Sequence, residues 1–104
     1  MRPDPVLPPD STTLLARAIV ADAASVGLSC TIAMWRSHPW ASATFTGTRH
    51  DAVLAIGRDG DPAAWLTALP DRDLTMRGHL LADLTATRRP DGTVGIDALT
   101  IEAI

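Results

Sequence analysis

The 104-residue chain contains no lysine, tyrosine, asparagine or glutamine. Without lysine it can form no Schiff base and has no ammonium group for a phosphate-binding loop. Without tyrosine it has no phenolic acid, and without side-chain amides it has no Asn or Gln donor for an oxyanion. Lysine, asparagine and tyrosine have AT-rich codons, whereas the codons of alanine, of which the chain has seventeen, are GC-rich. This composition predicts a GC-rich bacterial genome as the source of the chain.

The residues that are present set further limits on function. The single cysteine, Cys30, excludes an internal disulfide and a zinc site built from cysteines. The formal net charge of −3 argues against nucleic acid or an anionic membrane surface as a partner. No apolar run approaches the roughly 20 residues of a membrane-spanning helix, and no secretory signal is visible. We therefore expect a cytoplasmic protein.

Proline separates an N-terminal arm from a single domain. Residues 1–10 include four prolines, which disfavour a helix and predict an extended, Pro-rich arm. Residues 11–104 are enough for one α+β domain with one modest core. Because much of the apolar content is alanine, we expect a thin core, and this favours oligomerisation.

Two helices are predicted from their end signals. The first covers residues 12–26, because Asp10 or Ser11 can cap its start and Gly27 can end it. The second is short and begins after Asp61, which can accept hydrogen bonds from its first free N–H groups.

Alternation of apolar and polar residues predicts the first strands. Residues 28–36 alternate regularly, and Pro39 then allows only a turn or the edge of a sheet. Residues 41–56 change phase, with apolar residues at odd positions first and at even positions later. Either a tight hairpin at Arg49 and His50 or a bulge near His50 in one bent strand would explain this change.

The segment Arg-Pro-Asp-Gly-Thr at residues 89–93 is the clearest hairpin signal in the chain. It predicts a type I turn followed by Gly92 in a left-handed conformation. The resulting register places Leu81 opposite Ile101, and Leu99 lies on the same face of the predicted hairpin.

Together these elements predict an α+β fold of two layers. The expected order is helix, two or three strands, helix and two strands. An antiparallel sheet of four or five strands would then carry both helices on one face.

Five residues are candidates for a ligand pocket: Trp35, His38, Trp40, His79 and Asp83. The first three bring two aromatic rings close to an imidazole, a combination that binds flat ligands. His79 and Asp83 lie four residues apart on one predicted strand, so they should share a face. At ~3.3 Å per residue they are too far apart for a direct hydrogen bond, and this favours a polar sheet face over a general base.

The interface candidates are Leu81, Leu99 and Ile101, because the helices can cover only one face of the sheet. Our leading hypothesis is therefore a non-catalytic assembly or protein-interaction module that forms a homodimer. The alternative is a small-molecule binder or enzyme that uses the five pocket candidates. Binding of nucleic acid through arginine is the third hypothesis, and the net charge argues against it.

No motif in the chain assigns a cofactor. The spacing of His, Cys and carboxylate residues fits no metal site, and there is no Gly-rich phosphate loop or Gly-x-Ser-x-Gly elbow. We therefore assign no catalytic residue, no metal ligand and no cofactor from the sequence.

Overall fold

The structure is a computed structural model that describes residues 10–57 and 60–103. The arm expected at residues 1–10 thus lies, apart from Asp10, outside the described residues. The elements in chain order are α1 (Ser11–Ser25), β1 (Cys30–Ala41), β2 (Thr46–Ile56), α2 (Ala63–Ala68), the short 3-10 helix η1 (Leu69–Asp71), β3 (His79–Arg88) and β4 (Val94–Glu102). The predicted α+β fold is confirmed, with four antiparallel strands in the described part of the chain.

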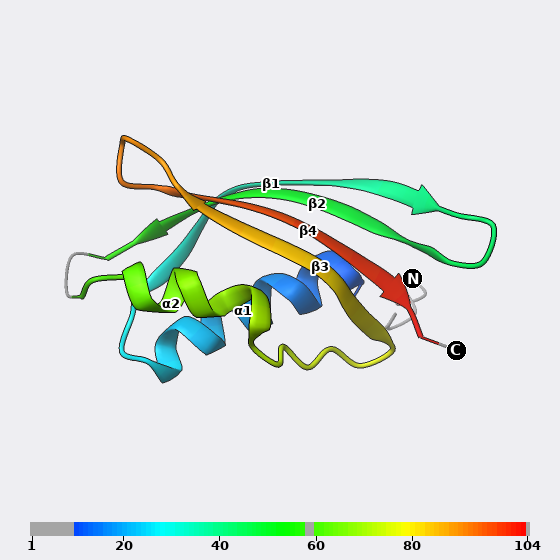
Figure 1. The fold of residues 1–104 in the computed structure, drawn as a ribbon, viewed down its shortest axis with the longest axis horizontal. Coiled ribbons are helices and arrows are strands. Elements are labelled where there is room, and N and C mark those ends of the chain that lie inside the picture. Colours follow the sequence, from blue (N-terminus) through cyan, green and yellow to red (C-terminus); the bar gives the residue numbers. More distant parts are fainter. Residues whose placement is uncertain (1–9, 58–59, 104) are drawn as a thin grey trace, which may run out of the picture.

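The sheet consists of two hairpins that meet through their second strands. Its order is β1-β2-β4-β3, so β2 and β4 are central while β1 and β3 form the edges. Both helices lie on one face of the sheet, and the paired ends of β1 and β2 project beyond the other strands (Figure 1). Each helix precedes one hairpin in the chain. Because both helices lie on the same face of the sheet, the domain has the two layers that the sequence predicts.

Helix α1 begins and ends at the predicted signals. The Asp10 carboxylate accepts a hydrogen bond from the backbone N–H of Thr13 at 2.9 Å, and this bond lowers the pKa of Asp10. At the other end Gly27 has φ of +82°, the left-handed conformation that glycine adopts readily. Apolar residues one turn apart, such as Leu15 and Ile19, face the sheet and are fully buried.

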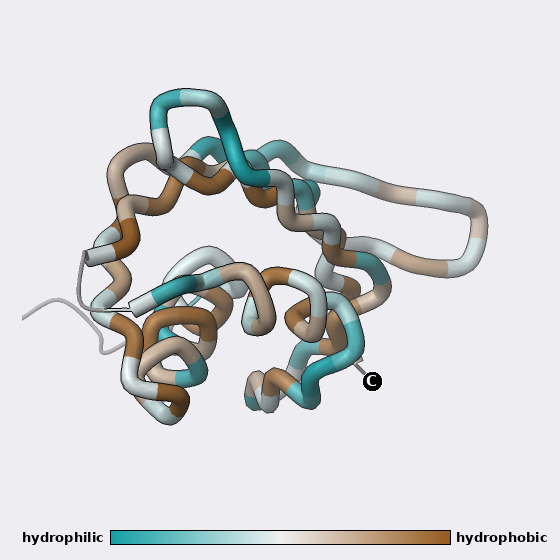
Figure 2. Tube along the Cα trace, turned by 60° about the vertical axis from the view of Figure 1, so that its left-hand side comes forward, coloured by the Kyte–Doolittle hydropathy of each residue, from teal (hydrophilic) through white to brown (hydrophobic). Residues whose placement is uncertain are grey.

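The core lies between the helices and the central strands. Every second residue of β2 and β4 points toward the helices, and the largest of these, Leu54 and Ile96, are almost completely buried. Helix α2 adds Trp65 and Leu66, and Leu69 begins η1. Figure 2 shows this pattern as hydrophobic segments that alternate with polar ones along the sheet and recur along the helices.

Both predictions for residues 41–56 are wrong. The first hairpin turns at Ser42–Phe45, where the N–H of Ser42 donates to the carbonyl oxygen of Phe45 at 2.8 Å. The N–H of Phe45 in turn donates to Ser42 Oγ at 3.0 Å. Most of the odd-numbered apolar residues therefore belong to the end of β1 and to the turn, and His50 lies in the middle of β2. Pro39 does lie in an edge strand, as predicted.

Two bulges change which residues share a face. The register of β3 shifts between Leu81 and Asp83, so Leu81 pairs with Thr100 and Leu80 takes the predicted place opposite Ile101. A second shift, between Ile32 and Met34, has the same effect on β1. Because a bulge inserts one residue, the side chains before and after it exchange faces.

The predicted turn at residues 89–93 is confirmed and gives a first mutational test. Gly92 has φ of +88°, and an added Cβ would meet nothing within 4 Å. Gly92→Val is therefore expected to cost about 1–2 kcal/mol through backbone strain alone. Gly92→Asn is the control, because asparagine tolerates this conformation better and should cost less. Urea unfolding of the three proteins measures the difference, and equal stability of Gly92→Val and the wild type would contradict the strain.

Candidate functional site

An apolar row crosses all four strands on the sheet face that points away from the helices. Trp40 on β1 pairs with Gly47 on β2, and Gly47 pairs with Ile101 on β4. Ile101 in turn pairs with Leu80 on β3. We refer to these four residues as the apolar row. Leu80 is 56% exposed, and Trp40 and Ile101 are partly exposed, so the row is an accessible apolar surface.

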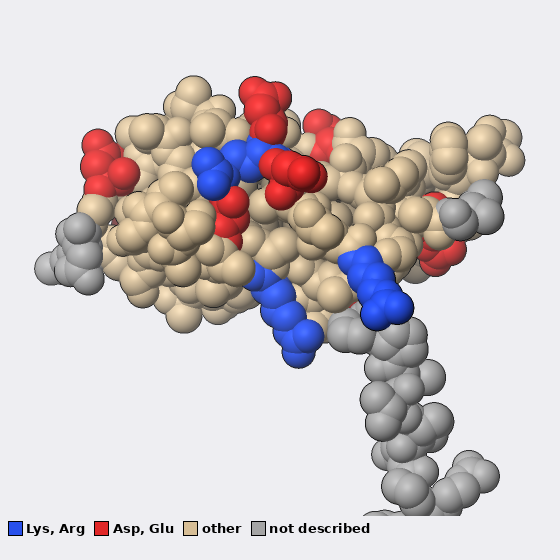
Figure 3. Space-filling view, turned by 90° about the horizontal axis from the view of Figure 1, so that it is seen from below, with Lys and Arg blue, Asp and Glu red and all other residues tan. Residues whose placement is uncertain are grey.

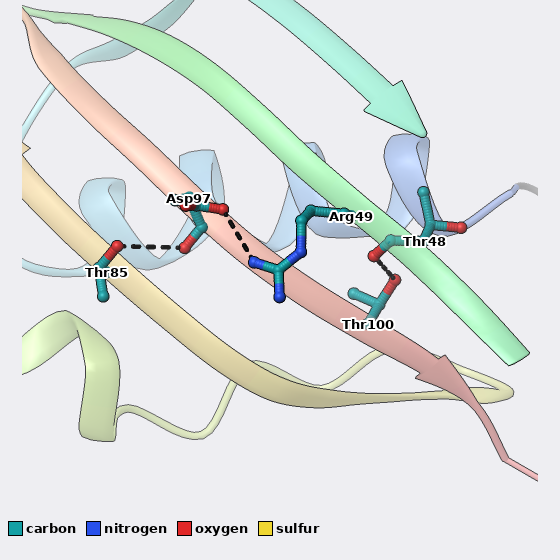
Figure 4. A network of polar contacts seen from close by, with 5 residues as sticks. All are labelled: Thr48, Arg49, Thr85, Asp97 and Thr100. Carbon is teal, nitrogen blue, oxygen red and sulfur yellow. Dashed lines mark hydrogen bonds and ion pairs between the residues drawn. The ribbon is translucent and has the colours of Figure 1, made fainter. Parts of the chain in front are cut away.

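Charged residues occupy the middle of the same face. Arg49 Nη1 on β2 lies 3.3 Å from Asp97 Oδ1 on β4, with 44% and 60% of their side chains exposed. Figure 4 shows this pair, together with the Thr85 hydroxyl, which donates to the carbonyl oxygen of Asp97. An exposed ion pair of this kind contributes at most about 1 kcal/mol to stability. The pair keeps this part of the face polar, whereas the apolar row lies near one end.

The structure scatters the predicted pocket residues. Trp35 lies on the helical side of β1, whereas His38 and Trp40 follow it on the opposite face of that strand. His79 and Asp83 belong to β3, at the other edge of the sheet. The bulge between Leu81 and Asp83 also places His79 and Asp83 on opposite faces, so the expectation that they share a face is wrong.

A groove next to β3 nevertheless contains both His79 and Asp83. It has a volume of about 540 Å³ and is lined by residues 70–76 and 79–84. Its rim carries the exposed side chains of Asp71 and Asp73. Figure 3 shows the helical side of the molecule, where several acidic side chains gather around a basic one. The groove is a hollow with an acidic rim, and within residues 10–57 and 60–103 no hydrogen bond orients the His79 ring as a base.

The interface candidates are partly rearranged. Leu99 and Ile101 lie on the uncovered face, where the sequence places them, and both are partly exposed. Leu81 lies on the helical side and packs against the core, because the bulge moves it there. Leu80 takes its place on the uncovered face.

A polar network around the buried His50 is the feature that sequence reasoning missed. His50 is 0% exposed, and its Nε2 lies 2.9 Å from Thr100 Oγ1. Its Nδ1 lies 3.2 Å from Trp35 Nε1 and 3.3 Å from Ser37 Oγ. Ser37 Oγ is also 2.6 Å from Thr12 Oγ1 in the first turn of α1. These five residues, which we call the His50 network, connect α1, β1, β2 and β4.

The neighbours of His50 determine its tautomer. The indole N–H of Trp35 is shared between two acceptors, Ser37 Oγ at 3.1 Å and His50 Nδ1 at 3.2 Å. Because the indole can only donate, this geometry favours an Nδ1 that accepts and carries no proton. The ring proton is therefore on Nε2, which donates to Thr100 Oγ1, and that hydroxyl donates to the carbonyl oxygen of Thr48 at 3.4 Å. Burial lowers the pKa of His50 below its usual 6.5, because a charged ring would lose its hydration.

This network resembles a nucleophile and base only in part. Ser37 lies next to an imidazole, but the Nδ1 lone pair of His50 already accepts from Trp35. The other ring nitrogen, Nε2, bonds to the Thr100 hydroxyl and not to a carboxylate. A neutral hydroxyl would stabilise a developing imidazolium poorly. We therefore assign the network no catalytic role.

Comparisons with protein-family models, with curated proteins and with solved structures found no match to this chain. Among the described residues, no group of three or more His, Cys, Asp and Glu side chains is placed to hold a metal ion. No helix in the described part of the chain combines the length and apolar character needed to cross a bilayer.

Proposed function

We propose that this protein is a non-catalytic assembly module that binds a second copy of itself through the apolar row. The observation that carries the proposal is the exposure of Leu80, at 56%, beside the partly exposed Ile101. Both lie on a face that no described element covers. Burial of such a surface against a second chain would stabilise the complex by roughly 25 cal/mol per Å² of apolar area.

The shape of the surface favours another sheet as the partner. The apolar row runs from one edge of the sheet to the other, so a flat partner covers it better than a small ligand does. A second copy supplies such a surface, and two sheets pack face to face about 10 Å apart. The neighbouring charges have both signs, as in Arg49 and Asp97, so two copies need not repel each other.

The projecting end of the first hairpin extends this surface. Residues 37–48 contain no Asp, Glu, Lys or Arg, and Phe45 in the turn is 46% exposed. Trp40 lies within this segment and belongs to the apolar row. A protruding, uncharged ribbon with an exposed aromatic ring is typical of segments that pack against another chain.

The proposal predicts a dimer that a single charge can weaken. Leu80→Asp is expected to raise the dimer dissociation constant by at least about tenfold, because the carboxylate would be desolvated in the contact. Leu80 is mostly exposed, so the variant should still fold. Ile101→Asp should have the same effect. Sedimentation equilibrium measures the constants, and circular dichroism verifies the fold.

The matched control is Thr87→Asp, which places the same carboxylate on the exposed part of β3 opposite Gly95, away from the apolar row. Its dissociation constant should stay near that of the wild type. A wild-type chain that is monomeric at high micromolar concentration would refute the homodimer. A folded Leu80→Asp variant that dimerises as well as the wild type would show that the contact lies elsewhere.

The alternative function is a small-molecule binder or enzyme at the groove beside β3. The presence of His79 and Asp83 in that groove favours it, but the two side chains belong to opposite faces of the strand. We therefore rank it second. The bacterial source and the cytoplasmic location rest on the sequence alone and stay predictions.

A further inference from the structure

We propose that the His50 network is an acid-sensitive latch, which holds the first turn of α1 against β1 and opens when the imidazole takes up a second proton. The latch belongs to the folded monomer and does not depend on the proposed assembly. Three properties of the network support it: a fixed tautomer, a buried ring and a direct connection to α1.

The hydrogen-bond geometry favours a neutral ring. Protonation at Nδ1 would place a donor 3.2 Å from the indole N–H of Trp35, which is also a donor. The proton could be accepted only by Ser37 Oγ, at 3.3 Å. The Trp35 indole would then lose its bond to His50 and would donate to Ser37 Oγ alone, at 3.1 Å. Protonation thus changes the hydrogen bonds of both Trp35 and Ser37.

The surroundings of His50 offer little compensation for a positive charge. From β1 it faces Trp35 and Ser37, and from β4 it faces Thr100, all of which are uncharged. The carboxylate of Asp10, at the start of α1, favours the charged ring, whereas His79 on β3 opposes it. Asp10 already accepts the capping hydrogen bond from Thr13, so it cannot move to the imidazole without uncapping the helix.

The rearrangement would reach α1 through one contact. Ser37 Oγ is 2.6 Å from Thr12 Oγ1, which joins β1 to the first turn of the helix. If Ser37 turns to accept a proton from His50, its geometry with Thr12 changes as well. We therefore expect the first turn of α1 and the Trp35 side chain to loosen together in acid, while the apolar core around Leu15 and Ile19 stays packed.

Nuclear magnetic resonance of the wild type tests the latch directly. At pH 7.5 the imidazole of His50 should be the Nε2–H tautomer. As the pH falls below about 6.5, hydrogen exchange of the Trp35 indole N–H, corrected for its intrinsic pH dependence, should accelerate at least about tenfold. The amides of the first turn of α1 should follow the same titration. An Nδ1–H tautomer, or corrected exchange that does not change with pH, would overturn the proposal.

Two variants assign the effect to one histidine. His50→Gln keeps a donor for Thr100 but cannot take up a proton, so the acceleration should disappear. His79→Gln is the control, because His79 is the other histidine that affects His50, and the acceleration should persist. Loss of the effect in His79→Gln, or its persistence in a folded His50→Gln, would overturn the assignment to His50.

Thermal melts provide a second readout with a defined sign. The unfolded chain takes up a proton on His50 near pH 6.5, whereas the folded chain does so only at lower pH. The contribution of His50 is therefore complete above pH 6.5 and is lost as the pH falls toward the folded pKa. The melting temperature should fall in this window in the wild type and less in His50→Gln. The capping carboxylate of Asp10 acts only below its ordinary pKa of 3.8, outside the window.

Discussion

Gly47→Val is expected to lower the free energy of unfolding by at least about 3 kcal/mol, because β2 and β4 approach each other too closely at this position for any side chain. A Cβ on Gly47 would overlap the backbone carbonyl oxygen of Thr100 and lie 3.1 Å from the Cα of Ile101. Both are backbone atoms of a central strand, so they cannot move without disturbing the hydrogen bonds between β2 and β4. Close-packed positions that are overfilled in this way lose stability through strain.

A second strand glycine is the matched control. Gly95 on β4 lies on the same face of the sheet, and the nearest atom to an added Cβ is Nε of the flexible Arg89 side chain, at 3.3 Å. Gly95→Val should therefore change stability by less than about 1 kcal/mol, since valine also favours strands. Urea unfolding compares the two variants with the wild type. If Gly47→Val unfolds at the same urea concentration as Gly95→Val, the close approach of the strands is not a constraint.

Local signals in the sequence predicted local structure well. The turn at residues 89–93 follows from proline and glycine, whose backbone preferences act within a few residues. The start of α1 at Asp10 and its end before Gly27 follow from the same kind of short-range chemistry. The α+β fold could be derived because these signals divide the chain into helices and hairpins in a definite order.

The positions of individual side chains could not be predicted, because they depend on long-range contacts. The turn at Ser42–Phe45 contains neither proline nor glycine and is held by hydrogen bonds of Ser42. The bulge that exchanges Leu80 and Leu81 arises from the pairing of β3 with β4, and one residue of shift moves a side chain to the other face. Leu81, one of the three interface candidates, therefore lies on the helical face, and an interface through Leu99 and Ile101 stays a prediction.

The His50 network shows the same limit at a candidate site. His50 resembled a turn residue, because it lies between Arg49 and Asp51 and polar residues favour turns. Its burial depends on Trp35 and Thr100, which are 15 and 50 residues away in the chain. The one available signal was the phase of β2, because His50 occupies an even position like the buried Ala52 and Leu54. A histidine in phase with core residues is a reason to look for buried partners.

Removal of the Asp22 carboxylate is the other substitution for which we expect a large loss of stability. Trp65 Nε1 on α2 donates to Asp22 Oδ2 at 2.8 Å, and Arg72, after η1, forms an ion pair with the same oxygen. Asp22 therefore links α1 to the second helical segment. Its side chain is only 15% exposed, and the buried Nε of Arg72 has no other partner in the described part of the chain.

Asp22→Ala is thus expected to destabilise the fold by about 3 kcal/mol, because it leaves an indole N–H and a guanidinium without their acceptor. This value is at the lower end of the range for a broken buried ion pair, because 33% of the Arg72 side chain is exposed and can be hydrated. Asp22→Asn retains an oxygen for Trp65 but loses the charge, so it should cost less than Asp22→Ala. Arg17→Ala, at an exposed position of the same helix, is the control and should change stability by less than about 0.5 kcal/mol. Urea unfolding measures all three. If Asp22→Ala and Arg17→Ala are equally stable, the second helical segment is held by its apolar side chains alone, and the Asp22 contacts contribute nothing to the packing of the two helices on the sheet.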